Sequence, residues 1–505
     1  MPFEVLTSNP GTFYGVDSTD TVVLPNGLLL TSATHGFSAI PSGSLTFNDS
    51  YLQIYGQVYA GGRGIDYWGA LSGINSYNNN TIFVGEAGVV SAVTFGIRAE
   101  SGANNQIQNY GQISGGTAIE SYGGANSVIL NGGLISGTLA YGVQMFGEVD
   151  TGSGPNTMIT NLAGGTISGR TAAIDLRDLV GGSSITNHGI ITSSLGVGIH
   201  LNDAAAGQSI ITVTNHGTVS GLVTSYLGSV NIDKLTNRGD MIGDVLMGDG
   251  SDTFDNRRGA VDGDVDLGAG NDIFDNRDGF VSGEVLGGAG NDLFRGDADL
   301  AETFFGGAGN ADVLDFRYGP GVVIALDGAF GNGGAAVGDV YAQVEWIYGS
   351  STEADTIRGN SAANYLYGLG GNDILNGAGG GDTLRGGPSA DNLTGGSGND
   401  TFRYMTIAEC GDVITDFSSS AVGNNDRFQF SAAGFGVGLV AGALAASQFR
   451  TRADNLAQDA DDRFIFRTND RTLWYDADGN DAGAAVMIAD LHAAATVTAA
   501  DIFII

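Results

Sequence analysis

Six aspartate or asparagine residues recur at intervals of nine, and this spacing is the feature of the chain best suited to chemistry. From residue 350 to residue 403 the chain divides without a gap into SSTEADTIR, GNSAANYLY, GLGGNDILN, GAGGGDTLR, GGPSADNLT and GGSGNDTFR. The sixth positions are Asp355, Asn364, Asp373, Asp382, Asp391 and Asp400. A glycine-rich turn, a carboxylate and a short apolar strand form a pattern typical of a Ca²⁺-binding parallel β-roll.

Stacked turns would bring these carboxylates to about 4.8 Å from one another, the spacing of neighbouring strands. At that distance like charges repel by roughly 1 kcal/mol in water and ~3.5 kcal/mol at an effective dielectric constant near 20. A cation between them removes the repulsion, and Ca²⁺ takes carboxylate and backbone carbonyl oxygens together. We expect such ions between units two apart, at Asp355–Asp373, Asp373–Asp391 and Asp382–Asp400.

Two of the six units are expected to bind less well. Asn364 lacks the charge that would hold an ion against Asp382. In the fifth unit, Pro388 and Ser389 stand where the other turns carry different residues, which weakens the expected site at Asp391.

A second array repeats every 20 residues. Its aspartates are Asp252, Asp272, Asp292 and Asp312, in the segments GDGSDTFDN, GAGNDIFDN, GGAGNDLFRG and GGAGNADVLDF. A 20-residue unit with two turn signals is one coil of a β-solenoid, so equal spacing places these aspartates at one corner of successive coils.

The turn glycines complete the expected Ca²⁺ sites, because their backbone carbonyls would lie next to the carboxylates. They are Gly250, Gly270, Gly290, Gly371, Gly380 and Gly398. The alternative for both arrays is that aspartate only caps turns. That alternative is preferred for Asp476, Asp478 and Asp481 near the C-terminus.

The solenoid pattern continues upstream without aspartate. An Asn-x-Gly turn followed by alternating apolar residues recurs from Asn109, Asn131, Asn187 and Asn215. Alternation places Val, Ile and Leu inside and Ser, Thr and Asn outside. We therefore expect an all-β chain: a parallel β-helix over residues 1–243, calcium-type coils over 244–315, a β-rich connector over 316–349, a β-roll over 350–403 and a small β-rich region over 404–505.

Composition excludes several classes of protein. The chain has 505 residues, 85 of them glycine, and a formal net charge of −35, which repels nucleic acid and anionic lipid. The one cysteine, Cys410, cannot form an internal disulfide. No apolar run approaches the ~18 residues of a membrane span, and the N-terminus lacks the features of a signal peptide.

The nonads, with the preceding VEWIYGSSTEADTIRG, resemble the RTX (repeats-in-toxin) family of calcium-dependent proteins exported by type I secretion. The likeness extends through DVITDF, DDRFIF, LWYDADG and the terminal DIFII, over roughly residues 244–505. It implies an uncleaved C-terminal export signal read by the type I secretion machinery. It also implies a chain that is unfolded inside the cell and folds on external Ca²⁺, of which it binds several ions.

The β-helix carries no enzyme signature that we recognise. There is no His-Glu-x-x-His, no Gly-x-Ser-x-Gly and no Asp-Pro-His of the kind found in alginate epimerases, which also join a β-helix to RTX modules. The arginines before residue 240 read as scattered across coils, and the cluster Asp175, Arg177 and Asp178 reads as a solvated loop. His188 and His216 share a phase and would stack as turn residues. We expect no catalysis.

Three functions remain open. The first is a secreted structural protein that self-assembles in a Ca²⁺-dependent way at the cell surface, as a layer, sheath or filament, because a regular solenoid presents repetitive faces. The second is an adhesin or glycan-binding surface module, and the third a polysaccharide lyase or epimerase on the β-helix. The expected partners are copies of the chain itself, and a cell-surface glycan for the second function.

Overall fold

The computed structural model describes residues 3–5, 13–14, 21–32, 35–38, 51–67, 79–100, 104–122, 126–147, 156–178, 182–202, 210–296, 301–420, 424–436, 438–481 and 483–505. It forms two compact units, Met1–Ala289 and Gly290–Ile505. Among the described residues no helix has the length and hydropathy of a membrane span. The expectation of an all-β fold with long parallel sheets is confirmed.

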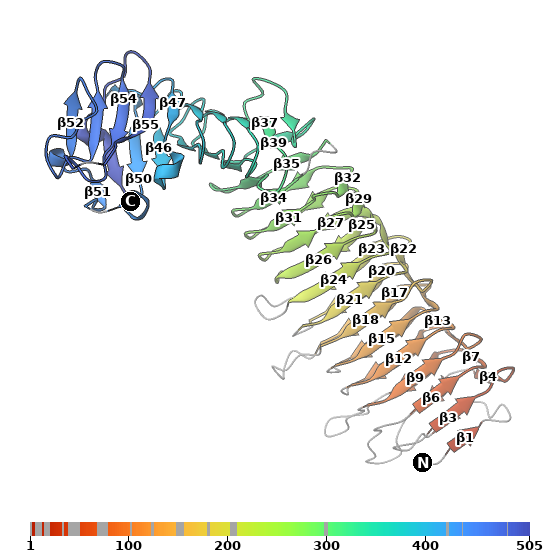
Figure 1. The fold of residues 1–505 in the computed structure, drawn as a ribbon. Helices are drawn as coiled ribbons and strands as arrows, with labels where there is room; N and C mark the ends of the chain where they lie inside the picture. The colour runs from red at the N-terminus through yellow and green to blue at the C-terminus, as the bar shows by residue number, and fades with distance from the viewer. Residues whose placement is uncertain are drawn as a thin grey trace. The chain divides into compact units, whose positions relative to one another are not determined.

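The N-terminal unit is a parallel β-helix whose coils add one strand to each of three faces, stacked as successive rungs (Figure 1). The first face consists of β1 (Phe3–Val5), β3 (Thr21–Leu24), β6 (Tyr51–Ile54), β9 (Thr81–Val84), β12 (Gln106–Asn109), β15 (Val128–Asn131), β18 (Met158–Asn161), β21 (Ser184–Asn187), β24 (Ile211–Asn215), β26 (Asp233–Asn237), β28 (Thr253–Asp255) and β31 (Ile273–Asp275).

The second and third faces follow the same order along the chain. The second face consists of β4 (Leu29–Ser32), β7 (Gln57–Ala60), β10 (Val89–Ala92), β13 (Gln112–Gly115), β16 (Leu134–Gly137), β19 (Thr166–Gly169), β22 (Ile190–Ser193), β25 (Thr218–Leu227), β27 (Asp240–Leu246), β29 (Ala260–Asp262) and β32 (Phe280–Val281). The third face consists of β2 (Phe13–Tyr14), β5 (His35–Ser38), β8 (Arg63–Tyr67), β11 (Phe95–Glu100), β14 (Thr117–Tyr122), β17 (Tyr141–Phe146), β20 (Ala172–Arg177), β23 (Val197–Asn202), the second halves of β25 and β27, β30 (Val265–Asp266) and β33 (Val285–Leu286).

Alternation along each strand fills the interior with aliphatic side chains. On the third face, for example, Ile97, Ile119 and Val143 are fully buried and pair in register from coil to coil. Polar residues at the alternating positions point outward, as the sequence pattern predicts. In successive coils, buried aliphatic side chains therefore stack on aliphatic side chains, and outward polar side chains stack on polar ones.

A buried ladder of asparagine amides holds the corner after the first face. Each amide Nδ2 donates to the Oδ1 of the next asparagine at 2.6–2.8 Å, and each member is fully buried. The members are Asn109, Asn131, Asn161, Asn187, Asn215, Asn237, Asn256 and Asn276. Because every amide is both donor and acceptor, this ladder satisfies polar groups that burial would otherwise penalise.

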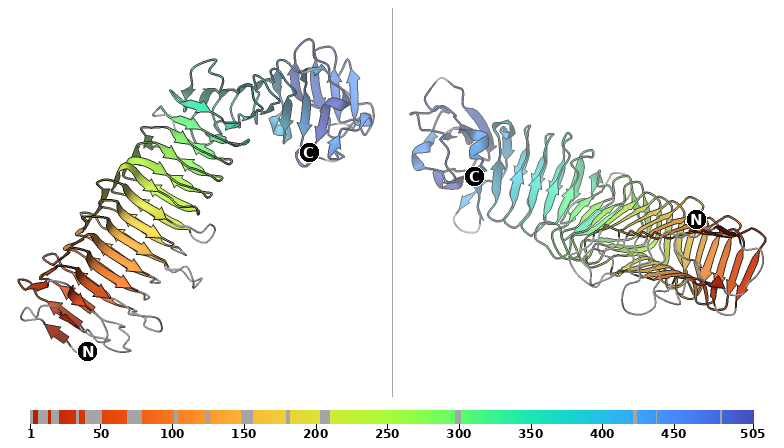
Figure 2. Two further views of the ribbon diagram at one scale, coloured as in Figure 1. Left: turned by 180° about the vertical axis from the view of Figure 1, so that it is seen from behind. Right: turned by 90° about the horizontal axis from the view of Figure 1, so that it is seen from below.

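The C-terminal unit begins with short coils and ends in a β-rich cap (Figure 2). One side of its coils consists of β34 (Leu293–Arg295), β36 (Val313–Asp315), β40 (Trp346–Tyr348), β42 (Tyr365–Tyr367), β44 (Thr383–Arg385), β46 (Thr401–Tyr404), β50 (Arg427–Phe430) and β56 (Ile502–Ile504). The other side consists of β37 (Val322–Ala325), β41 (Thr356–Arg358), β43 (Ile374–Asn376), β45 (Asn392–Thr394) and β47 (Asp412–Ile414).

The remaining elements of this unit connect and close the coils. They are β35 (Thr303–Phe305), β39 (Val340–Ala342), β38 (Gly333–Gly334), β48 (Ser419–Ser420), β49 (Asn424–Asn425), β51 (Gly442–Ala443), β52 (Phe449–Arg452), β53 (Phe464–Arg467), β54 (Thr472–Tyr475), β55 (Val486–Leu491), the helix α1 (Ala432–Phe435) and the 3₁₀ turns Ile407–Glu409, Ala446–Gln448 and Ala499–Asp501. Strand β47 pairs with β55, so the roll runs directly into the cap.

Candidate metal sites

The nonads stack in two columns, because strands 18 residues apart pair in parallel. On one side Ile357 pairs with Leu375, and on the other Leu366 pairs with Leu384, as expected for units two apart. The sixth-position residue precedes each strand, and its side-chain oxygen accepts the backbone N–H of the residue one turn before it in the chain. The columns are Asp355, Asp373, Asp391 and Asp412, and Asn364, Asp382, Asp400 and Asp426.

Four inner aspartates of these columns each carry a carboxylate oxygen that has no hydrogen-bond partner among the residues that the structure describes. They are Asp373, Asp382, Asp391 and Asp400, each no more than 2% exposed. In Asp382, for example, Oδ1 accepts the Asn364 N–H at 2.8 Å, whereas Oδ2 is buried with no hydrogen-bond partner among the described residues. A buried carboxylate oxygen left in this state is costly unless a cation or donor meets it.

Glycine at the first position of the second to sixth nonads makes room beside the carboxylate. A Cβ atom at Gly368, Gly377 or Gly386 would lie only 2.0–2.1 Å from the Oδ2 of Asp373, Asp382 or Asp391 respectively. The fourth-position glycines predicted as ligands, Gly371, Gly380 and Gly398, adopt positive φ of 123°, 113° and 139°, a conformation that L side chains rarely adopt. The turns therefore bring backbone and carboxylate close together.

Burial changes the acidity of the roll carboxylates. Burial raises the pKa of Asp382 to about 7, with a further contribution from the charge of Asp400, and the Asn364 N–H offsets only part of this shift. Burial likewise raises the pKa of Asp391 to about 7 and that of Asp373 to about 6. Bare carboxylates are thus unfavourable in these columns, which is the condition that a bound cation relieves.

Two end members, Asp355 and Asp426, differ from the inner aspartates, whereas the end member Asp412 resembles them, since its Oδ2 is buried with no hydrogen-bond partner among the described residues. Both oxygens of Asp355 accept backbone N–H groups, from Val322 and Ser350, and both oxygens of Asp426 do so from Asp400 and Ser418. These carboxylates need no ion to satisfy them. Asn364 also uses its amide within the turn, where its Oδ1 accepts the Asn360 N–H.

The 20-residue coils of the N-terminal unit repeat this arrangement. The Asp252 N–H donates to Asp272 Oδ1 at 2.6 Å, and the Asp233 N–H donates to Asp252 Oδ1 at 2.7 Å. Burial, and then the charges of Asp233 and Asp272, raise the pKa of Asp252 to about 8, although the Asp233 N–H lowers it. Asp252 Oδ2 is buried without a partner among the described residues. Gly250 and Gly270 have φ of 128° and 150°, and a Cβ on Gly270 would overlap the Gly250 carbonyl oxygen.

In the C-terminal unit the same kind of column begins with Asp292, whose N–H donates to Asp312 Oδ1 at 2.8 Å. Asp312 is fully buried, its Oδ2 has no partner among the described residues, and its pKa rises to about 6 on burial. The Asp312 N–H donates in turn to Glu345 Oε2 at 3.1 Å. Gly290 has a φ of 137°, as at the equivalent turns.

The residues fit Ca²⁺ in their chemistry: hard carboxylate oxygens that lack partners, beside turns whose backbone carbonyls are close by. Within the part of the chain that the structure describes, no three His, Cys, Asp or Glu side chains gather closely enough to hold an ion by themselves. An ion in these columns would take a carboxylate from one or two turns and the remaining oxygens from the backbone.

Sequence spacing missed four members of the columns: Asp233, Glu345, Asp412 and Asp426. Asp412 and Asp426 follow their predecessors by 21 and 26 residues instead of 18, so the nonad count could not reach them. Asp412 and Asp426 can be identified by their place in the strand register, because each directly precedes the first paired residue of the next strand, Val413 or Arg427.

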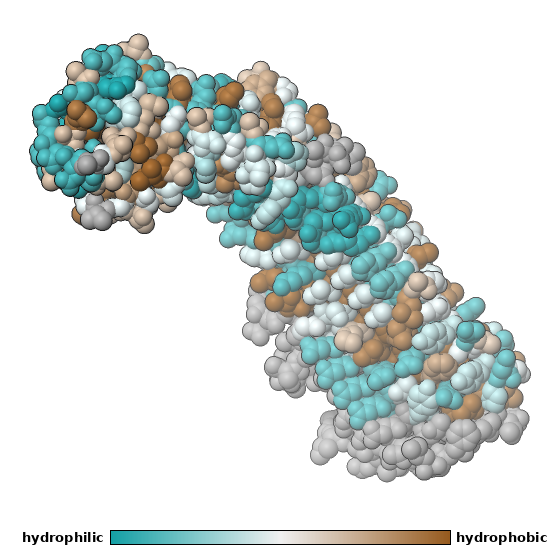
Figure 3. Space-filling view, in the orientation of Figure 1, coloured by the Kyte–Doolittle hydropathy of each residue, from teal (hydrophilic) through white to brown (hydrophobic). Residues whose placement is uncertain are grey.

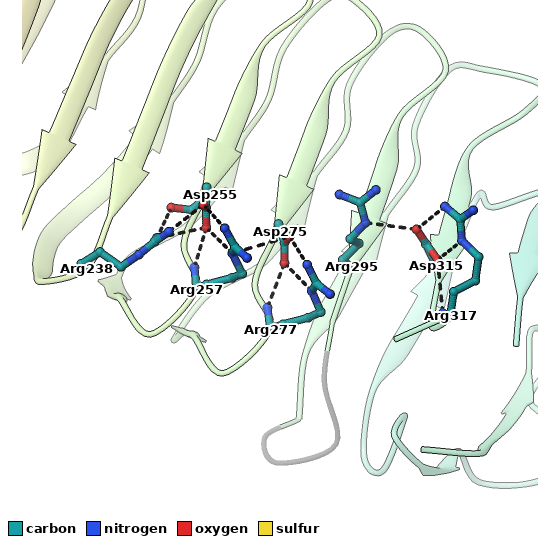
Figure 4. Close-up of polar contacts among 8 residues, drawn as sticks. All are labelled: Arg238, Asp255, Arg257, Asp275, Arg277, Arg295, Asp315 and Arg317. Carbon is teal, nitrogen blue, oxygen red and sulfur yellow. Dashed lines mark hydrogen bonds and ion pairs between the residues drawn. The ribbon is translucent and has the colours of Figure 1, made fainter. Parts of the chain in front are cut away.

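A second set of aspartates serves a different purpose. Asp255, three residues after Asp252, accepts hydrogen bonds from Arg238 and Arg257, and Asp275 accepts two from Arg277 (Figure 4). Burial opposes ionisation of Asp255, but the bonds from the two arginines outweigh it and hold the pKa well below its ordinary value. Figure 3 shows hydrophilic residues gathered over the coils that Figure 1 draws in green. The carboxylates of Asp255 and Asp275 are therefore already neutralised by arginine.

Asp315 in the C-terminal unit follows the same rule, since it accepts hydrogen bonds from Arg295 and Arg317. Burial raises its pKa, but those two arginines lower it further than burial raises it. The sequence therefore holds two kinds of aspartate, distinguished by whether an arginine reaches them.

The expectation that Asp175 and Arg177 lie in a solvated loop is wrong. Both belong to strand β20, and Asp175 is fully buried, with bonds from Gln144 at 2.8 Å and Arg177 at 2.6 Å and an ion pair to His200 at 2.9 Å. A residue that points outward from a sheet is buried here because its neighbours in adjacent coils are large and polar.

The expectation of scattered arginines is also wrong in part. Arg63, Arg98 and Arg177 lie on the third face, where Arg98 stacks on Tyr122 and Arg177 on Phe146, at 5.5 Å in each case. Tyr122 and Phe146 stack on each other with ring centroids 4.3 Å apart. Each of the three arginines also pairs with a carboxylate of the third face, so the net charge of these arginines and their partners is close to zero.

Two smaller predictions also meet the structure. His188 and His216 stack, with ring centroids 4.8 Å apart, which confirms their shared phase. Asp476 accepts the N–H of Asp478, and Asp478 accepts that of Gly483, which supports the turn-capping alternative for this segment.

Comparison with known proteins identifies one part of the chain. Residues 350–384 and 376–404 match the family described as RTX calcium-binding nonapeptide repeat (4 copies). No curated protein matches the chain. The matched residues include six of the eight column members, and Asp412 and Asp426 lie beyond them. Such repeats typically bind Ca²⁺ and are typical of proteins exported by type I secretion.

Proposed function

We propose that this chain, with RTX calcium-binding repeats at residues 350–404, is a secreted structural protein that Ca²⁺ orders outside the cell and that self-assembles at the cell surface. The observation that carries the proposal is the set of buried carboxylate oxygens at Asp373, Asp382, Asp391 and Asp400 that have no hydrogen-bond partner within the described part of the chain. Each of these oxygens destabilises the ion-free fold, so the free energy of Ca²⁺ binding contributes to the stability of the folded chain.

The turns of the 20-residue coils extend the proposal beyond the nonad roll. Asp252 and Asp312 have the same burial and the same kind of unpartnered oxygen as the roll aspartates. Extracellular modules bind Ca²⁺ with dissociation constants near 10⁻⁴–10⁻³ M, so the sites would stay empty in the cytosol and fill outside. This would keep the chain unfolded for export through the type I secretion machinery.

Self-assembly is supported by the regularity of the solenoid, which presents a Ser or Thr side chain at one outward position of six successive coils. Ser91 and Ser114, for example, stack at corresponding positions of β10 and β13 with hydroxyl oxygens 3.0 Å apart. Electron microscopy of the purified chain tests the proposal. Extended or layered particles that require millimolar Ca²⁺ and disperse in EGTA are expected, and dispersed single particles in both conditions would overturn it.

A glycan-binding surface module is the second candidate function, and the row on the third face favours it. Six successive coils place Asp66, Arg98, Glu120, Gln144, Asp175 and His200 at one outward register position. Retention of the monomer on a polysaccharide column, lost on Arg177→Ala and kept in an Arg170→Ala control, would favour this function. No catalytic role is proposed for these residues.

A further inference from the structure

The second face of the β-helix carries an uncharged surface, which we define by the segments 89–93, 112–116, 134–139, 166–170, 190–195 and 218–222. Arg170 is the one charged residue in these six segments, whereas 15% of the whole chain is charged. The strands concerned, β10, β13, β16, β19, β22 and β25, pair in register from one coil to the next. This surface, the uncharged face, is therefore continuous.

Its outward residues form three parallel rows. The first row is Val89, Gln112, Leu134, Thr166, Ile190 and Thr218, and the second is Ser91, Ser114, Ser136, Ser168, Thr192 and Ser220. The hydroxyl groups of the second row bond in pairs along the row, at 2.8–3.1 Å. Short, mutually bonded side chains of this kind leave a sheet surface flat.

The third row follows the corner after these strands and carries exposed apolar side chains in four of the six coils, with Gly116 and Arg170 in the other two. Val93, Leu139, Leu195 and Leu222 are 55–64% exposed, which is unusual for side chains of this size placed in line. Backbone bonds connect the row from coil to coil, for example from the Leu195 N–H to the Arg170 carbonyl. A repeated apolar edge beside a flat hydroxyl surface indicates a contact surface rather than isolated exposed residues.

We propose that the uncharged face is where a second copy of this chain packs, sheet against sheet. The proposal rests on the proposed function and names the surface that performs the self-assembly. Two chains of net charge −35 repel each other, so close approach is least costly where both surfaces lack charge. Acidic residues begin immediately beyond the face, at Asp240 of the next coil, and they limit how far one copy can slide along the other.

The face is also large enough for a specific contact. Six coils at ~4.8 Å and strands of about five residues at ~3.3 Å give about 29 Å by about 17 Å, or roughly 500 Å² per copy. Two such surfaces bury roughly 1,000 Å², which is near the lower limit for specific interfaces. A contact of this size between identical faces pairs two copies of the chain.

Sedimentation velocity of the full chain in millimolar Ca²⁺ tests the proposal, with a matched pair of variants. Ile190 lies on the uncharged face and Met158 on the first face, and they are exposed to 46% and 47%. Ile190→Glu is expected to weaken self-association by at least tenfold, about 1.4 kcal/mol, because it places like charges in the contact. Met158→Glu introduces the same charge at the same exposure and is expected to change association little.

The outcomes separate this proposal from the calcium proposal. If both variants show the wild-type circular dichroism response to Ca²⁺, the calcium columns are intact and only the contact is being tested. Equal association of Ile190→Glu and Met158→Glu, or a wild-type chain that stays monomeric at every concentration up to about 100 μM, overturns the uncharged face as the interface. Loss of the Ca²⁺ response in the wild type would instead contradict the proposed function. Leu195→Glu repeats the test at the apolar edge.

Discussion

Replacing Asp382 or Asp426 by asparagine should affect different quantities, the first the stabilisation by Ca²⁺ and the second the stability in either condition, although the two residues share a column and are nearly equally buried. Asp382 Oδ2 has no hydrogen-bond partner among the described residues, whereas Asp426 Oδ2 accepts the Ser418 N–H at 2.8 Å. Asp382→Asn therefore removes a charge that faces only the expected ion. Asp426→Asn exchanges an acceptor for a donor that meets another donor.

The magnitudes follow from these contacts. With Ca²⁺ near 5 mM and a dissociation constant near 10⁻⁴ M, one ion stabilises the folded chain by about 2 kcal/mol. Asp382→Asn should reduce the Ca²⁺-dependent gain by at least that amount, while the chain in EGTA becomes no less stable because repulsion from Asp400 is relieved. Asp426→Asn should cost about 1–3 kcal/mol both with and without Ca²⁺ and leave the gain unchanged.

Thermal unfolding of the wild type and both variants, in EGTA and in Ca²⁺, measures the two quantities separately. The quantity to compare is the increase in stability on adding Ca²⁺. If that increase is the same in Asp382→Asn as in the wild type, the unpartnered oxygen is not an ion ligand and the argument from burial is refuted. A reduced increase in Asp426→Asn would refute the distinction between inner and end members.

Three further predictions follow from the same structure. In EGTA, the stability of the folded chain should fall as pH rises from about 4 to about 7, because Asp382 and Asp391 keep protons in the folded chain that they release on unfolding. A melting temperature in EGTA that instead rises with pH over this range would contradict the prediction. Ala378→Gly should raise stability by about 0.5–1 kcal/mol in urea unfolding, since Ala378 has a φ of 74°, and a loss of stability would count against strain there. Asn187→Ala should cost about 2–4 kcal/mol in the same assay because it breaks the amide ladder. The neighbouring Thr186→Ala should cost less than about 0.5 kcal/mol, and equal costs would show that the ladder does not stabilise the fold.

The fold and the periodic part of the site could be predicted because each repeat places one residue type at one position. Six nonads in phase dictate that units two apart stack, and the observed pairing of Ile357 with Leu375 follows directly. The column continues to Asp412 and Asp426 without that spacing, since the intervening loops vary in length while the strand register stays constant.

Charge partners were harder to foresee, because they come from other coils. Asp252 and Asp255 are close in the sequence, yet burial raises the pKa of the first while arginines from two coils lower that of the second. Asp175 is a second example. Its sequence neighbours predict a polar loop, whereas in the structure Gln144 and His200 from adjacent coils contact its carboxylate. Contacts between coils with gaps of 20 to 30 residues are set by register, which local patterns do not encode.

A Ca²⁺ titration of the EGTA-treated chain, followed by far-ultraviolet circular dichroism, tests the central claim most directly. We predict a weaker β-signal in EGTA and a cooperative gain of β-signal between about 10⁻⁴ and 10⁻³ M Ca²⁺, which Mg²⁺ at the same concentration does not reproduce. A β-spectrum already complete in EGTA and unchanged on adding Ca²⁺ would contradict the account.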